Sequence, residues 1–192
     1  MTGTCSLELY FITSNKHKFM EVLPIAKKHG IDLRMLPGEK IEIQSNNLMD
    51  IAFYSAIENY KKLRKPLLVE DAGLFIEALN GFPGPYSSYV YKTLGVNGIL
   101  KLMENESNRR AYFLSAVVLI HEPYIIRVEE RVYGHITYSA RGNKGFGFDP
   151  IFVPEGAEKT FAEMSIDEKN KYSHRAKAVS KAFDKLQRLL KT

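Results

Sequence analysis

Short apolar runs alternate with segments of helical period over the first seventy residues, and this order constrains the fold more than any other feature. Runs rich in β-forming residues at 7–12, 31–35 and 67–69 are typical of buried strands. Between them, segments 16–29 and 48–63 carry apolar residues at helical spacing. The resulting β-α-β-α-β order favours an α/β domain.

The second half of the chain begins with a segment of helical character at 96–103. Two long β-like runs follow at 111–121 and 125–138, and they predict a long hairpin or meander. A glycine-rich loop is expected at 142–150. A capping-box spacing beginning at Ser165 introduces a basic amphipathic segment that we expect to be the last helix.

Composition places the chain among globular proteins. Of its 192 residues 45% are hydrophobic, enough for a sizeable core, and no linker or repeat interrupts them, so we expect one domain over 1–192. The single cysteine, Cys5, excludes an intramolecular disulfide and fits a reducing cytoplasm. No apolar stretch approaches the roughly 20 residues that span a bilayer, and no signal peptide is visible, so we expect a cytoplasmic protein with no membrane partner.

The net charge of +5 allows an acidic partner, but the lysines are spread along the chain as on solvated faces. The charge is therefore weak support for a nucleic-acid partner, and we expect none.

A polar turn follows the first predicted strand and opens the first predicted helix. A helix N-terminus offers free N–H groups and the positive end of its dipole, and lysine ammonium groups add charge that suits a phosphate. The alternative is an ordinary polar cap followed by solvated lysines. The turn consists of Thr13, Ser14, Asn15, Lys16, His17 and Lys18.

Two adjacent carboxylates, Glu70 and Asp71, follow the apolar run 67–69, and we expect them at the carboxyl end of that strand. Ligands of open α/β sheets gather at this edge, and Mg²⁺ binds through one or two carboxylates together with substrate phosphates. The alternative is a helix start, where acidic residues are also favoured. Glu42 is a weaker candidate that requires the fold to bring it near Asp71.

The segment Gly145–Pro150 combines glycines with aromatic rings. Gly147 allows close approach of the backbone to a ligand, and Phe146 and Phe148 can stack on a base. Asp149 can accept a hydrogen bond from a base N–H. The alternative is a hairpin loop whose aromatic rings face the core.

Cationic and polar groups also gather at the start of the last predicted helix. Lys169, His174 and Arg175 supply donors that suit a phosphate or a base carbonyl, although a solvated basic helix start would look the same. The motifs of a serine nucleophile elbow, a P-loop and a dinucleotide-binding turn are absent from the sequence.

In their order along the chain, these segments resemble the inosine triphosphate pyrophosphatase family, from Phe11 to about Arg175. Each motif alone is weak, but the whole series in family order is specific. The matching segments are Thr13-x-Asn15-x-x-Lys18, Val69–Leu74, Ala78–Tyr86, Gly145–Phe152, Thr160–Met164, Glu168-Lys169 and Ser173–Arg175.

The resemblance implies an α/β fold with a long, curved mixed β-sheet flanked by helices, in which two lobes enclose a nucleotide cleft, and it implies a homodimer. It also implies Mg²⁺-dependent hydrolysis of deaminated purine nucleoside triphosphates (ITP, dITP and XTP) to the monophosphate and pyrophosphate, which clears them from the nucleotide pool. The cut would fall between the α and β phosphates.

The resemblance also assigns roles. Thr13 to Lys18 would cradle the triphosphate, and Asp71 would accept a proton and, with Glu42, hold the metal with Glu70 close by. The positions matching substrate contacts are Ala72, Phe146, Gly147, Phe148, Asp149, Lys169, His174 and Arg175. Relatives often carry serine or threonine at Ala72 and basic residues near Ser55 and Ser88, so the side-chain contacts made there do not carry over.

Two other functions compete with this reading. One is a pyrophosphatase for modified pyrimidine or methylated nucleotides on a related sheet, which equal turnover of dUTP and ITP would favour. The other is a basic RNA- or DNA-binding module with Phe146 and Phe148 as stacking platforms, which salt-sensitive oligonucleotide binding without hydrolysis would favour.

Overall fold

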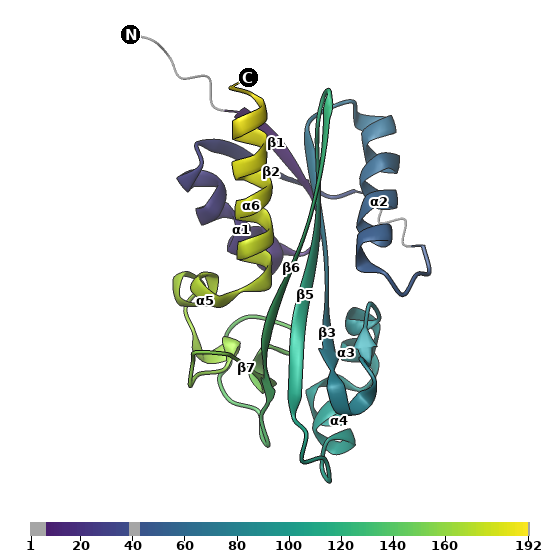
Figure 1. Cartoon of the computed structure of the whole chain (residues 1–192), viewed down its shortest axis with the longest axis vertical. Helices are drawn as coiled ribbons and strands as arrows, with labels where there is room; N and C mark the ends of the chain where they lie inside the picture. The colour runs from purple at the N-terminus through teal and green to yellow at the C-terminus, as the bar shows by residue number, and fades with distance from the viewer. Residues whose placement is uncertain (1–6, 39–42, 192) are drawn as a thin grey trace.

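The computed structural model describes residues 7–38 and 43–191, and one mixed sheet of seven strands forms its frame (Figure 1). The strand order is β2-β1-β3-β5-β6-β7, and β4 pairs with β3 off this path. The elements are β1 (Leu7–Ile12), α1 (Lys16–Lys28), β2 (Ile31–Leu36), α2 (Leu48–Leu63), β3 (Leu67–Ile76), β4 (Pro83–Gly84), α3 (Ser87–Thr93), α4 (Gly95–Leu102), β5 (Arg110–His121), β6 (Tyr124–Ile136), β7 (Phe152–Pro154), α5 (Ile166–Tyr172) and α6 (His174–Leu189).

Helices cover both faces of the sheet in its upper half (Figure 1). On one face, α1 and α6 pack on a core that includes Phe11, Val117 and Phe183. On the other face, α2 covers a core that includes Ala52 and Val118. The predicted α/β class, with a mixed sheet flanked by helices, is confirmed.

Strands β3, β5 and β6 are long enough to run through two lobes (Figure 1). The upper lobe holds β1, β2, α1, α2 and α6, and the lower lobe holds α3, α4, β7 and the loops beside them. A separate core fills the lower lobe, where Phe113, Phe152 and Phe161 pack on one another. The site residues lie where the lobes meet.

Strand β3 corrects one prediction. It does not end at Val69 but continues to Ile76, paired with β5 along its whole length, so Glu70 and Asp71 lie in the middle of a strand. Gly73 lets β4 pack against this part of β3, because a Cβ there would lie 2.3 Å from the carbonyl oxygen of Gly84 on β4. Successive strand residues face opposite sides of a sheet, so the two carboxylates point to opposite faces.

The strand edge beside these carboxylates is open on one side. β1 pairs with β3 only at Tyr10–Leu67 and Phe11–Leu68, and β4 begins pairing at Leu74. Between these points, no strand of the described chain covers that edge of β3. The turn after β1 therefore meets Glu70 and Asp71 through side chains rather than through a strand.

Other local predictions meet mixed outcomes. Helix α1 runs without a break through Pro24, and the last predicted segment divides at Ser173 into α5 and α6. The capping box at Ser165 is confirmed, since its Oγ accepts from the N–H of Glu168 at 3.2 Å and its own N–H donates to the Glu168 carboxylate at 3.1 Å. In the described chain, no helix is long and apolar enough to cross a membrane.

Candidate functional site

The turn between β1 and α1 is fixed by its own side chains. Thr13 Oγ1 accepts from the N–H of Asn15 at 3.1 Å, and Asn15 Oδ1 accepts from the N–H groups of His17 and Lys18 at 2.9 and 3.3 Å. The predicted polar cap is thus present, and it occupies two of the N–H groups that the anion prediction left open. What the turn still offers an anion is mainly the charge of Lys18.

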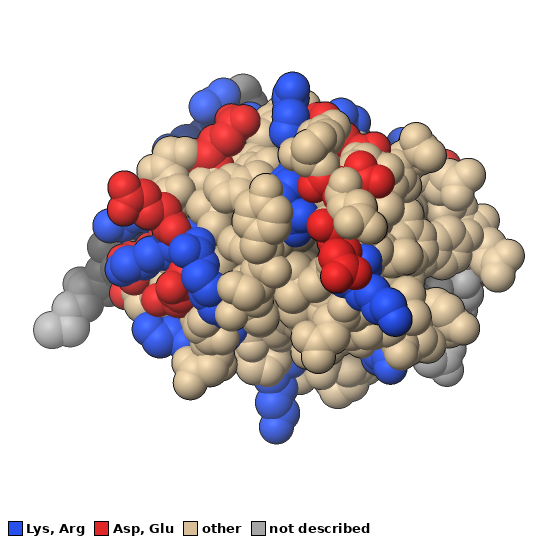
Figure 2. Space-filling model, turned by 90° about the horizontal axis from the view of Figure 1, so that it is seen from below, with Lys and Arg blue, Asp and Glu red and all other residues tan. Residues whose placement is uncertain are grey.

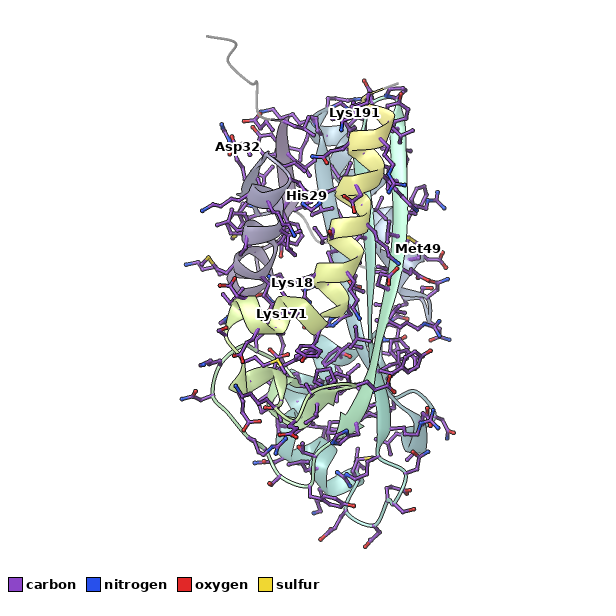
Figure 3. All side chains as sticks on the ribbon, turned by 60° about the vertical axis from the view of Figure 1, so that its left-hand side comes forward. Lys18, His29, Asp32, Met49, Lys171 and Lys191 are labelled. Atoms are coloured by element: carbon purple, nitrogen blue, oxygen red, sulfur yellow. The ribbon has the colours of Figure 1, made fainter. Side chains whose placement is uncertain are left out.

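Lys18 joins this turn to the acidic pair on β3. Its Nζ lies 2.9 Å from Oε2 of Glu70, 3.2 Å from the Glu70 carbonyl oxygen and 4.0 Å from Oδ1 of Asp71. Figure 3 labels Lys18 at the lower end of α1, close to the start of α6. The first two predicted motifs therefore meet.

Glu70 points to the α6 face and is almost fully buried. Its Oε1 accepts a hydrogen bond from Ser115 Oγ at 2.8 Å and lies 3.1 Å from Nε of Arg175, while Lys18 approaches Oε2. Burial alone would raise the pKa of Glu70, but the Arg175 and Lys18 cations outweigh burial and hold it well below its ordinary value. Glu70 is an ionised carboxylate fixed among cations.

Asp71 faces the other side of the sheet and keeps 13% of its side chain exposed. Its Oδ1 accepts from the N–H of Ala72 at 3.1 Å. Glu42, its predicted companion at a metal, lies outside the described residues. Within 7–38 and 43–191, no group of three or more histidine, cysteine, aspartate or glutamate side chains forms a candidate metal cluster.

A buried network of ion pairs extends from Glu70 into the lower lobe. Lys169 Nζ lies 2.7 Å from Oε1 of Glu21 and 2.6 Å from Oδ2 of Asp149, and Arg175 binds the other oxygen of Glu21 and also contacts Glu70. Since each side chain is almost completely buried, each cation needs these carboxylates.

The pKa values of the buried acids follow their partners. Burial would raise the pKa of Glu21, but Arg175 and Lys169 lower it below its ordinary value. Burial raises the pKa of Asp149, and the attraction of Lys169 only partly opposes this. Glu21 was missed in the sequence, although its position three residues after Lys18 on α1 places it on the same helix face.

The glycine-rich loop carries one accessible aromatic ring, that of Phe146. The Phe146 N–H donates to Oδ2 of Asp149 at 2.9 Å, and Gly145 has a φ of +72° with no room for a Cβ beside that carboxylate. Gly147 also has positive φ, and open space lies at its Cβ position. Phe148 is buried in the lower core against Tyr91, so for this ring the core-facing alternative is correct.

His174, at the start of α6, is buried and stacks on Phe113, with ring centroids 4.7 Å apart and planes 7° apart. Burial and the nearby Arg175 lower the pKa of His174 well below its ordinary value, so the ring is neutral. Neither ring nitrogen has a hydrogen-bond partner in the described structure. Buried polar atoms of this kind need an explanation, and a bound ligand supplies one.

The remaining predicted residues differ in position. Ser14 and Lys16 are exposed. Ala72 lies opposite Ser115 and offers only its backbone. Ser55 is buried on α2, and Ser88 is exposed on α3.

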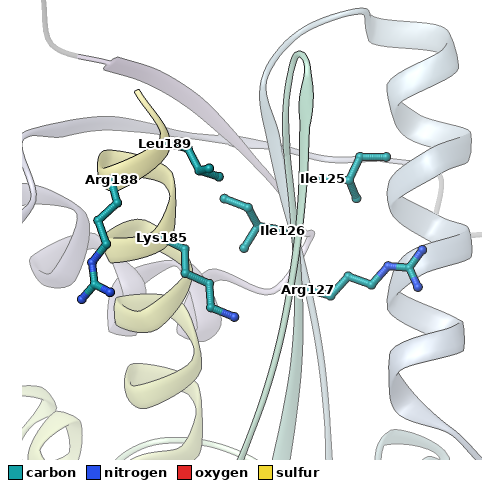
Figure 4. Close-up of a pocket in the computed structure, with 6 residues that line it drawn as sticks. All are labelled: Ile125, Ile126, Arg127, Lys185, Arg188 and Leu189. Atoms are coloured by element: carbon teal, nitrogen blue, oxygen red, sulfur yellow. The ribbon is translucent and has the colours of Figure 1, made fainter. Parts of the chain in front are cut away.

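A surface hollow and the distribution of surface charge differ from this site. A hollow of about 470 Å³ between the β5–β6 hairpin and the end of α6 has no carboxylate in its lining (Figure 4). Its lining residues are Ile125, Ile126, Arg127, Lys185, Arg188 and Leu189. On the face shown in Figure 2, basic and acidic residues are interleaved on a largely uncharged surface, so this face forms no continuous basic track of the kind that follows a nucleic-acid backbone.

The chain is similar to known proteins in both sequence and fold. Residues 9–185 match the model of the Ham1 family. A dITP/XTP pyrophosphatase of Hyperthermus butylicus is 52% identical over 166 residues, which cover 86% of this chain and 87% of that protein. One of Pyrococcus horikoshii is 46% identical over 185 residues, covering 96% and 100%. The structure of a HAM1 protein from Coxiella burnetii has a TM-score of 0.80 at 27% identity and covers 95% of this chain and 99% of its own.

Proposed function

The chain belongs to the Ham1 family, and on that premise we propose that it hydrolyses ITP, dITP and XTP to the nucleoside monophosphate and pyrophosphate, which clears deaminated purines from the nucleotide pool. Relatives that carry the name dITP/XTP pyrophosphatase support this substrate class. The observation that carries the proposal is the position of Glu70, whose carboxylate lies 2.9 Å from Lys18 and 3.1 Å from Arg175. Glu70 therefore separates a candidate phosphate contact, Lys18, from a candidate base contact, Arg175. A bound nucleotide needs both kinds of contact in one site.

We assign the rejection of adenine to the buried donors near α6. Hypoxanthine and xanthine carry a 6-oxo acceptor where adenine carries an amino donor. A neutral His174 has one N–H donor to present, and Arg175 has several. Against adenine, such buried donors would stay unpaired, which can discriminate by about 10⁴-fold.

We propose Mg²⁺ as the cofactor, and the donor set at Asp71 fits it. Asp71 is a partly exposed carboxylate beside an open strand edge, and Mg²⁺ binds through one or two carboxylates with substrate phosphates and water. By resemblance Glu42 is the second carboxylate. When bound, the ion supplies charge neutralisation on the phosphates and acidifies a water. Glu70, already paired with two cations, is the weaker ligand.

The residues of the site have distinct parts in the proposed reaction. Asp71 orients the attacking water and takes its proton. Lys18, held near the acidic pair by Glu70, turns toward the triphosphate and neutralises charge that develops on the pyrophosphate leaving group. The network around Glu21 keeps Lys169 and Arg175 fixed while the substrate binds.

We also propose, from composition and sequence pattern, that 1–192 forms one domain and that the protein acts in the cytoplasm. The family resemblance leads us to propose a homodimer. Light scattering coupled to size-exclusion chromatography tests the dimer. A mass of one chain across the working concentration range would contradict it.

A substrate panel tests the function. The protein is incubated with Mg²⁺ and ITP, XTP, GTP, ATP or dUTP, and monophosphate plus pyrophosphate is resolved from diphosphate plus phosphate. We expect pyrophosphate from ITP and XTP, and turnover of ATP lower by at least about 100-fold. Equal turnover of dUTP and ITP, or release of orthophosphate, would refute the proposal. Omission of Mg²⁺ with a chelator should abolish turnover.

A further inference from the structure

An aromatic contact between the lobes involves a residue that the family resemblance assigns to the triphosphate. The imidazole of His17, on the first turn of α1, stacks on the ring of Phe146 in the glycine-rich loop. The ring centroids are 5.4 Å apart, and the planes differ by 22°. The side chain of His17 thus extends toward the aromatic loop and not toward Asp71.

The backbone of His17 is also poorly suited to a phosphate. Its N–H already donates to Asn15 Oδ1 at 2.9 Å, so that group is satisfied within the turn. The neighbouring side chain, Lys18, points to Glu70 and Asp71 and accounts for the charge of this turn at the acidic pair. His17 and Lys18 therefore serve different ends of the site.

The environment of Phe146 decides which side of its ring can open. The cations of Lys169 and Arg175 lie 5.2 and 5.4 Å from its centroid, and buried ion pairs hold both in place. His17 is exposed, and in the described chain its ring makes no hydrogen bond. Separating His17 from Phe146 costs one exposed stacking contact, whereas moving either cation breaks buried ion pairs.

We propose, resting on the proposed function, that the purine ring enters between His17 and Phe146, so that His17 is the second stacking wall of the base subsite. Each aromatic contact separates ring centroids by about 4.5 Å or more, so two contacts in series place the outer centroids roughly 9 Å apart. The pair must therefore open by about 4 Å from its present centroid spacing of 5.4 Å. A change of the His17 side-chain rotamer together with a small movement of the turn provides this. The faces of the base are then held by two rings, while its edge is read by the donors at His174 and Arg175.

This arrangement makes His17 a residue for base affinity and not for the chemical step. A purine, with its two fused rings, covers more of both walls than a pyrimidine does. A ligand that has only the phosphates has no base to stack. Loss of the His17 ring should therefore weaken ITP binding more than it weakens binding of that ligand.

The test compares His17→Ala, His17→Phe and the control His135→Ala, an exposed histidine on β6. We measure kcat and KM for ITP and the inhibition constant of inorganic tripolyphosphate. Because the variant loses one of the two aromatic surfaces that stack on the base, we expect His17→Ala to raise KM by about tenfold. We expect kcat to stay within about twofold, the tripolyphosphate constant to be unchanged, and His17→Phe to restore KM.

Two results would overturn the inference. If His17→Ala weakens tripolyphosphate as much as ITP, or His17→Phe fails to restore KM, then His17 contacts phosphate through its imidazole. If His17→Ala leaves KM unchanged or lowers it, the present stack is a surface contact that the base merely displaces.

Calorimetric titration with IMP separates this inference from the proposed function, because it needs no turnover. Weaker IMP binding to His17→Ala, restored in His17→Phe, supports the stacking wall even if the wild-type protein releases no pyrophosphate. Equal IMP affinity in all variants refutes the stacking wall even if the substrate panel succeeds.

Discussion

The two ends of the site are built on different physical terms. At the proposed base end, Lys169, His174 and Arg175 are 2–3% exposed, Glu21 pairs both cations and Asp149 pairs Lys169. At the proposed phosphate end, the side chains of Lys18 and Asp71 are 14% and 13% exposed, and the other residues of the turn lie near the surface. Buried ion pairs hold the first end, whereas the side chains of the second end are partly open to solvent.

The difference follows from what each end must do. Discrimination between a 6-oxo and an amino group depends on donors that cannot rearrange, because a mobile donor would find another partner. In the proposed reaction, the phosphate charge and its metal arrive together, so the groups that meet them exchange partners at that moment. Glu70 connects the two ends, since it contacts Arg175 on one side and Lys18 on the other.

The largest expected effect lies at the phosphate end. Asp71→Asn removes the proposed proton acceptor, and we expect kcat for ITP to fall by about 10³-fold, within the usual range for a general base. The free energy of unfolding should change by less than about 1 kcal/mol, because the side chain is partly exposed. Steady-state kinetics and urea denaturation measure the two. Asp32→Asn, a surface control, should leave kcat unchanged, and near wild-type kcat in Asp71→Asn would remove Asp71 from the mechanism.

At the base end the main effect should be on stability. Glu21→Gln leaves Lys169 and Arg175 with less than their full partner charge in a buried place, and we expect the free energy of unfolding to fall by about 3 kcal/mol. Glu58→Gln is the matched control, because Glu58 also lies on a helix but pairs with the exposed Lys61. Its loss should cost less than about 0.5 kcal/mol. Equal losses of unfolding free energy in the two variants would show that the buried Glu21 network stabilises the fold no more than an exposed ion pair does.

A smaller effect is expected in the pH dependence of stability. Because the pKa of the buried His174 is lowered, the unfolded chain takes up a proton below about pH 6.5 that the folded protein does not. Stability is therefore full above that pH and falls as pH decreases toward 5, by up to about 1.4 kcal/mol per pH unit. His174→Phe should remove this slope, and identical slopes in both proteins would indicate that His174 is charged when folded.

The smallest predicted effect concerns the cap of α1. Asn15→Ala deprives the N–H groups of His17 and Lys18 of their acceptor, and we expect a loss of about 1 kcal/mol in the free energy of unfolding. Because the cap also orients Lys18, KM for ITP should rise. Asn15→Asp, which keeps the acceptor oxygen, should retain the stability. A stable Asn15→Ala with unchanged KM would mean that the turn holds its shape without the cap.

Much of the fold could be predicted from residue periodicity. The bounds of α2 and the hairpin of β5 and β6 matched closely, because each has a clear apolar period. The length of β3 was missed, since Ala72 and Gly73 do not look like strand residues and only pairing with β5 keeps them extended. A tertiary contact decided what the local sequence left open.

The site shows the same limit. Lys18, Arg175 and the acidic pair were predicted as site residues from charge and motif, and the structure brings Lys18 and Arg175 to Glu70. The sequence did not show that Glu70 and Asp71 lie within a strand and face opposite sides of the sheet. Glu21 gave no motif, because its role depends on cations from a distant segment. The pairing of His17 with Phe146 likewise depends on how the lobes meet.

The separation of the two ends is tested most directly by the substrate preference of Asp71→Asn. The measurement is kcat/KM for ITP divided by kcat/KM for ATP, in the variant and in the wild-type protein, with enough enzyme to detect the residual turnover. If the base end is fixed independently of the chemical step, this ratio stays within about threefold of wild type while both rates fall together. A variant that loses its preference for ITP along with its rate would contradict the division between the two ends.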